Sequence, residues 1–171
     1  MKARSLGWTL GCSLLAACAS SLPPRAVIEH DLGAFAYRRY QKSLDIEVPI
    51  AGNDAVGHTA SYLRRGAQGE VAVATAFVTI YAHGKQLVTK ARAALQNLGG
   101  YTLTTVELAG EPVWQLDTPG RERWCVWVSE RRLIKIGVQA GQPFPEDVVA
   151  PYLALYPSEV QLDADSRTAQ R

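Results

Sequence analysis

Residues 70–81 read EVAVATAFVTIY, and this stretch decides the fold expected for the 171-residue chain. After Glu70 it contains no charge, and β-branched and aromatic residues alternate with smaller ones, which favours a β-strand. One face carries the larger side chains of this stretch. The other face carries Ala72, Ala74, Ala76, Val78 and Ile80. Because both faces are apolar, we expect a central strand that is covered at least on its alanine face.

The clearest helix follows at once, over residues 85–98. Its apolar side chains recur at helical spacing and form one stripe: Leu87, Val88, Ala91, Ala94, Leu95 and Leu98. Gly99 and Gly100 then supply a C-terminal stop. The small alanine side chains of the preceding strand predict that this helix packs closely against it.

Four further strands are expected in a meander, over residues 101–108, 113–117, 123–129 and 133–140. In the third of these, Trp124, Val126 and Val128 form the inward set, and Cys125 and Trp127 share the opposite face. A last helix begins near Pro145 and ends before Pro157.

The segment before residue 70 has weaker patterns. Asp31 is a possible N-cap, and an apolar stripe predicts a short helix over residues 31–43. Alternation over residues 44–48 predicts an edge strand that Pro49 ends. Because residues 51–69 contain several glycines, we expect a loop there, with a short strand at residues 61–63.

These elements favour an α+β fold. We expect one antiparallel β-sheet of about 5–6 strands, with two or three helices packed on one face. The single domain is expected to span residues 30–157, and the polar tail, residues 158–171, is expected to be disordered.

The N-terminus has the three parts of a secretory signal. Lys2 and Arg4 are positive, and an uncharged, mostly apolar run over residues 5–15 is too short to span a bilayer. Leu15-Ala16-Ala17-Cys18 then resembles the lipobox of bacterial lipoproteins. The resemblance implies a signal peptide at residues 1–17, with a diacylglycerol on the Cys18 thiol and often a further acyl chain on its amine. It covers residues 1–18 alone.

The resemblance places the protein in the cell envelope, anchored in the membrane by the lipid on Cys18 and facing the periplasm. Ala19 follows the cysteine, and the absence of Asp at this position favours the outer membrane of a Gram-negative bacterium. Residues 18–29 would be the lipidated N-terminus and tether. Without residues 1–17 the chain has 16 basic and 16 acidic residues, so its charge gives no case for nucleic-acid binding.

Arginines supply the one candidate ligand site. Arg121, Arg123, Arg131 and Arg132 lie near the ends of one expected hairpin and could converge on an anionic component of the envelope. The alternative is a solvated edge, with the arginines stacked on Trp127 or paired with neighbouring acids.

The sequence offers little support for metal binding by histidines or for a reactive cysteine. His30, His58 and His83 have no metal-ligand spacing, so we expect neither a metal nor a cofactor. Cys125 lies in an apolar strand and is expected to be a buried, inert thiol.

The lipobox resemblance and these candidate residues lead to two predicted functions. The first is a non-catalytic, periplasm-facing domain for binding or assembly, with other envelope proteins or anionic envelope components as partners. The alternative is an envelope-associated enzyme, a hydrolase, whose catalytic residues are dispersed in the sequence. A polar pocket with His58 or His83 beside a carboxylate would favour the enzyme.

Overall fold

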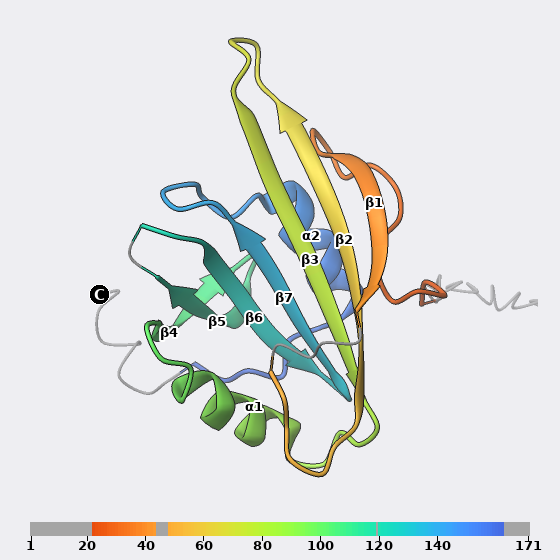
Figure 1. Cartoon of the computed structure of the whole chain (residues 1–171), viewed down its shortest axis with the longest axis vertical. Coiled ribbons are helices and arrows are strands. Elements are labelled where there is room, and N and C mark those ends of the chain that lie inside the picture. The colour runs from red at the N-terminus through yellow and green to blue at the C-terminus, as the bar shows by residue number, and fades with distance from the viewer. Residues whose placement is uncertain (1–21, 44–47, 119, 163–171) are drawn as a thin grey trace, which may run out of the picture.

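The computed structural model describes residues 22–43, 48–118 and 120–162, and within them it shows one antiparallel β-sheet and two helices (Figure 1). The seven strands are β1 (Ala36–Ser43), β2 (Ala55–Arg65), β3 (Val71–Tyr81), β4 (Thr102–Leu108), β5 (Glu111–Asp117), β6 (Arg123–Ser129) and β7 (Arg132–Val138). Their order is β1-β2-β3-β7-β6-β5-β4. The α+β class and the antiparallel sheet are confirmed, and the sheet has more strands than the 5–6 expected.

β3 lies inside the sheet, between β2 and β7, as its two apolar faces predict. Along β3 the register aligns Ala76 with Ala60 of β2 and with Ile136 of β7. β2 and β3 are each 11 residues long and form a hairpin that extends beyond the rest of the sheet (Figure 1).

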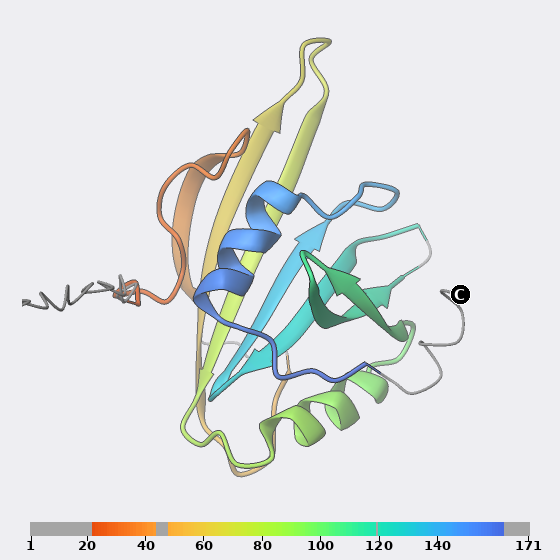
Figure 2. The same ribbon diagram turned by 180° about the vertical axis from the view of Figure 1, so that it is seen from behind.

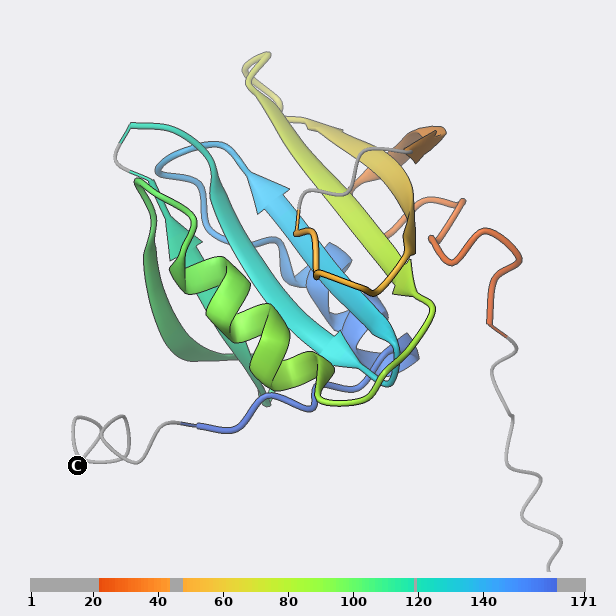
Figure 3. The same ribbon diagram turned by 60° about the horizontal axis from the view of Figure 1, so that its bottom comes forward.

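The two helices lie on opposite faces of the sheet, so the expectation of helices on one face is wrong. α1 (Leu87–Gln96) packs against β4 and β6, and α2 (Glu146–Leu155) packs behind the sheet (Figure 3). We call the sheet face with Leu116, Trp124 and Lys135 the α1 face. The opposite face, with Tyr62 and Trp127, is the α2 face.

The chain connections explain this arrangement. α1 joins β3 to β4, which is the strand at the far edge, so it crosses the sheet on the α1 face. The alanine side of β3 belongs to the α2 face, because Ala76 pairs with Ile136 and Cys125 lies opposite Ile136. α2 returns across that face (Figure 2), so the helix that covers the alanines is α2 and not α1.

The helix expected over residues 31–43 is instead a tight turn followed by β1. Leu32 and Phe35 exchange two backbone hydrogen bonds across Gly33, whose φ is 54°. A bulge between Tyr37 and Arg39 then shifts the register of β1. The bulge puts Tyr37 and Tyr40 on the same face, three residues apart, and this spacing imitates a helix.

The loop expected over residues 51–69 is largely β2, which pairs along its length with both β1 and β3. The edge strand expected at residues 44–48 falls mostly outside the described residues. Val48 itself is buried and lies in no strand.

Packed chain extends to both sides of the span 30–157. Val27 and Ile28, in the expected tether, are 0% and 8% exposed. After α2, the backbone N–H of Glu159 donates to the Val128 carbonyl, and Val160 is buried. Neither α1 nor α2 has the length and apolar character needed to cross a membrane, and the same holds for every helical segment in the described ranges.

Candidate ligand-binding site

A cavity of about 370 Å³ lies on the α1 face, between the sheet and the C-terminal end of α1. Its lining is mostly apolar, and two of the residues come from the end of the helix, Leu95 and Leu98. Strands and loops supply the other described residues: Val48, Tyr101, Leu116, Glu122, Trp124 and Lys135. A cleft of this volume lies within the range of small-molecule sites.

Lys135 brings the buried charge to this cavity. It lies on β7 opposite Phe77 of β3, and its Nζ is 4.6 Å from the centre of the Phe77 ring and 3.8 Å from that of Trp124. Both contacts are within the range of a cation–π interaction. Burial lowers the pKa of the Lys135 amine to about 7, because a low-dielectric surrounding disfavours the charged form.

A glycine positions Trp124. Gly137 is the direct partner of Trp124 across β6 and β7, and a Cβ at Gly137 would lie 2.2–2.5 Å from three atoms of the indole ring. The ring therefore lies over the bare backbone of β7, and this brings it beside Lys135. Phe77 contacts the same indole edge to face, with 5.5 Å between ring centres.

Two further hollows adjoin the cavity. A small one shares Val48 and Lys135 with it and also contacts Ser43, His58 and Phe77. A larger, open depression shares Tyr101 and Glu122 with the cavity and contains Arg121. Of the four arginines proposed from sequence, Arg121 is thus the one beside the cavity.

The structure separates the four arginines into two groups. Arg121 and Arg123 lie at the start of β6, and Arg131 and Arg132 follow its end, about 20 Å away for a seven-residue strand. They therefore do not share a single anion site.

Two of these arginines are held by other groups. Arg123 donates to Asp117 (2.8 Å) and to the carbonyl of Gln142, and it stacks on Phe144. Arg132 pairs with Glu130 and stacks on Tyr156, and not on Trp127 as the alternative from sequence had it.

The histidines and Cys125 do not form a catalytic arrangement in the described part of the chain. The Nδ1 atom of His58 lies 3.0 Å from the Tyr40 hydroxyl, and burial, followed by the charge of Lys42, lowers its pKa. Cys125 is fully buried, and burial raises the pKa of its thiol to about 12. No group of three potential metal ligands occurs among the residues that the structure places.

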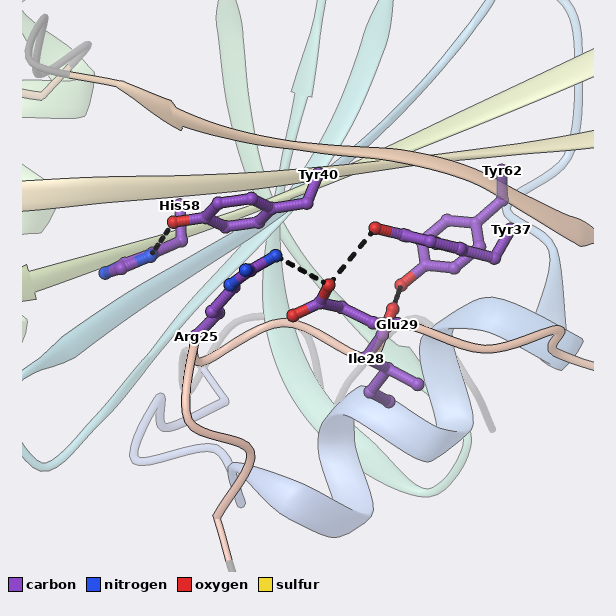
Figure 4. A network of polar contacts seen from close by, with 7 residues as sticks. All are labelled: Arg25, Ile28, Glu29, Tyr37, Tyr40, His58 and Tyr62. Carbon is purple, nitrogen blue, oxygen red and sulfur yellow. Dashed lines mark hydrogen bonds and ion pairs between the residues drawn. The ribbon is translucent and has the colours of Figure 1, made fainter.

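A closed cycle of hydrogen bonds holds the N-terminal segment against the α2 face, and Figure 4 shows the part of it that Ile28 and Tyr62 form. The Tyr62 hydroxyl donates to the Ile28 carbonyl (2.5 Å), and the Ile28 N–H donates to the Tyr152 hydroxyl (3.0 Å). The two hydroxyls are 2.8 Å apart, and since the Tyr62 proton is already used, Tyr152 donates to Tyr62. Every polar group in this buried cycle is satisfied.

Residues on either side reinforce this cycle. Glu29 accepts from Arg25 (3.1 Å) and from the Tyr37 hydroxyl (3.3 Å), and the Tyr156 hydroxyl donates to the Ala26 carbonyl (2.9 Å). The tyrosines of this cluster come from two segments that we expected to be helices, residues 31–43 and the last helix, and from residues 51–69, expected to be a loop. Of these three segments only the last helix is helical. The cluster serves to dock residues 26–29.

The α1-face cavity is therefore the candidate ligand site, and the α2 face is a packed surface whose buried tyrosine hydroxyls are hydrogen-bonded. Neither a protein-family model, nor a curated protein, nor a solved structure matches this chain.

Proposed function

We propose that this protein is a lipid-anchored binding protein of the bacterial cell envelope, whose domain takes an apolar ligand in the α1-face cavity. The observation that carries the binding proposal is the cavity itself, with its lining of Val48, Leu95, Leu98, Leu116 and Trp124. Its described lining contains no histidine, serine or cysteine. This favours binding over the alternative, a hydrolase with dispersed catalytic residues.

Two features support anchoring close to the membrane. Leu15-Ala16-Ala17-Cys18 supplies the acylation sequence, and the buried backbone at residues 26–28 fixes the point at which the chain enters the domain. Ala26 is the eighth residue after Cys18, so the tether spans at most about 28 Å. We propose that the lipid is inserted in the outer membrane and that the domain faces the periplasm.

Replacing Cys18 by alanine is expected to abolish anchoring. The thiol is the only group in the lipobox that can form the thioether, and two or more acyl chains are needed for stable membrane attachment. We expect the wild-type chain in the membrane fraction with a mass that includes the lipid and excludes residues 1–17.

The Cys18→Ala chain should retain its signal and carry no lipid, as measured by mass spectrometry of the fractionated protein. Cys12→Ala is the matched control, because it removes a cysteine that lies within the expected signal. A wild-type chain that is soluble and unlipidated would refute the anchoring proposal.

Filling the cavity is expected to remove ligand binding. The probe is N-phenyl-1-naphthylamine, an uncharged apolar dye whose fluorescence rises in apolar sites. It is titrated into the full chain in phosphatidylcholine nanodiscs, and the signal of empty nanodiscs is subtracted. We expect saturable binding to wild type and a loss of about tenfold or more for Leu98→Trp, because the indole occupies the apolar volume.

Val88→Trp is the matched control on the same helix, since Val88 is half-buried and lies outside this cavity. It should bind the dye as wild type does. No excess signal for wild type, or equal binding by a folded Leu98→Trp chain, would show that the cavity is not a binding site.

A further inference from the structure

We propose that the ligand of the α1-face cavity is a single-chain amphiphile with one carboxylate, held with the carboxylate against the Lys135 ammonium and the hydrocarbon chain along Leu95, Leu98 and Leu116. This inference rests on the proposed function and adds the chemical class and orientation of the ligand.

The charge on the sheet side of the cavity selects an anion. Lys135 is the one cationic side chain among the described residues that line the cavity. A buried carboxylate requires a charged or hydrogen-bonded partner. An ammonium has three donors, so Lys135 can give one to a ligand oxygen in addition to the contacts that it makes within the chain.

Two aromatic residues determine the position of the Lys135 ammonium. Trp124 and Phe77 both lie within cation–π distance of Nζ, so the ammonium is held at the wall of the cavity instead of extending into solvent. A single positive charge also matches a carboxylate, with one negative charge, better than a phosphate, with nearly two.

The mouth of the cavity determines which end of the ligand enters first. Glu122 is exposed and lines the mouth together with Tyr101. Its carboxylate would repel a ligand carboxylate placed at the mouth, whereas Lys135 would attract one at the sheet. Leu95, Leu98 and Leu116 then offer apolar surface to the chain.

The experiment compares decanoate with decan-1-ol, which share a ten-carbon chain and differ in the charged end. Binding to the full chain in phosphatidylcholine nanodiscs is followed at pH 6 by ¹³C NMR of ligands labelled at carbon 1, which separates protein-bound from bilayer-dissolved ligand. We expect wild type to bind decanoate at least about tenfold more tightly than decan-1-ol. Lys135→Met should lose this preference and still bind decan-1-ol, and Lys90→Met, on the exposed side of α1, should keep it.

Binding to the wild-type chain, measured over a range of pH, tests the role of the Lys135 charge without a substitution. Glu122 is the one acidic side chain among the described residues that line the cavity with Lys135. Burial lowers the pKa of Lys135 to about 7, so the ammonium is lost as the pH rises from 6 to 9. Decanoate affinity should fall by about tenfold or more over this range, while decan-1-ol affinity stays constant.

The outcomes separate the two proposals. If wild type binds neither compound, the cavity is not a ligand site and the proposed function fails with it. If wild type binds both equally, or if Lys135→Met keeps the preference for decanoate, the cavity binds apolar ligands and the carboxylate inference is overturned.

Discussion

Replacing Trp127 by alanine is expected to lower the free energy of unfolding by about 3–5 kcal/mol. Trp127 is fully buried on the α2 face, and its Nε1–H donates to the Tyr156 carbonyl at 2.7 Å. The substitution removes the largest side chain between β6 and the end of α2, and it leaves that carbonyl without its donor. Urea denaturation followed by circular dichroism measures the loss.

Trp124→Ala is the matched control, since it removes the same side chain from the same strand but from the α1 face. Trp124 is only partly buried, so its loss should cost less stability than that of Trp127 while weakening ligand binding in the cavity. If Trp127→Ala gives a chain too unstable to measure, Trp127→Phe keeps a ring and should cost about 1–2 kcal/mol through the lost hydrogen bond. Equal losses at the two tryptophans would contradict the packing described for the α2 face.

Replacing Gly137 by alanine is expected to cost about 1–3 kcal/mol and to disturb the ligand site. The new methyl group would lie in the space of the Trp124 indole, where three ring atoms are 2.2–2.5 Å from the Cβ position. The ring cannot flex in the way that a linear side chain can, so it must move off β7 and away from Lys135. Decanoate affinity should therefore fall together with stability.

Gly99→Ala provides the control for this effect. A Cβ at Gly99 meets no atom within 4 Å, and the residue does not adopt a positive φ. Its stability should stay within about 0.5 kcal/mol of wild type, and its ligand affinity should not change. A Gly137→Ala chain with wild-type stability and affinity would show that the position of Trp124 does not depend on the bare backbone of β7.

Local patterns predicted the elements whose periodicity is unbroken. The apolar run at residues 70–81 predicts β3 and its interior position, and the stripe from Leu87 to Leu98 predicts α1. Burial of Leu87, Ala91 and Leu95 confirms that stripe. These predictions succeed because each segment repeats one spacing over ten or more residues.

The same reasoning failed where the spacing is altered by a partner strand. The bulge in β1 gives its tyrosines a helix-like spacing, and β2 contains a glycine and several polar residues that pairing on both sides accommodates. Propensity is a weak guide for such segments, because most of their stability comes from neighbours that are distant in sequence.

For the candidate site, the sequence favoured the arginines and indicated no role for Lys135. Nothing near Lys135 in sequence indicates the site, since Phe77 comes from β3, Trp124 from β6, and Leu95 from α1. The arginines seemed to converge because they are near in sequence, yet β6 extends between them.

By itself, then, the sequence determined the central strand, the first helix and the α+β class, all of which depend on residues adjacent in the chain. The lipobox at residues 1–18 lies outside the described residues and stays a prediction. Only the tertiary structure decided that the helices cover opposite faces, that tyrosines dock the N-terminal segment, and that Lys135 lies over two aromatic rings beside a cavity. The physical reason is the strand order, which places β7 next to β3 and β4 at the far edge. Side chains separated by tens of residues thereby meet at the α1-face cavity.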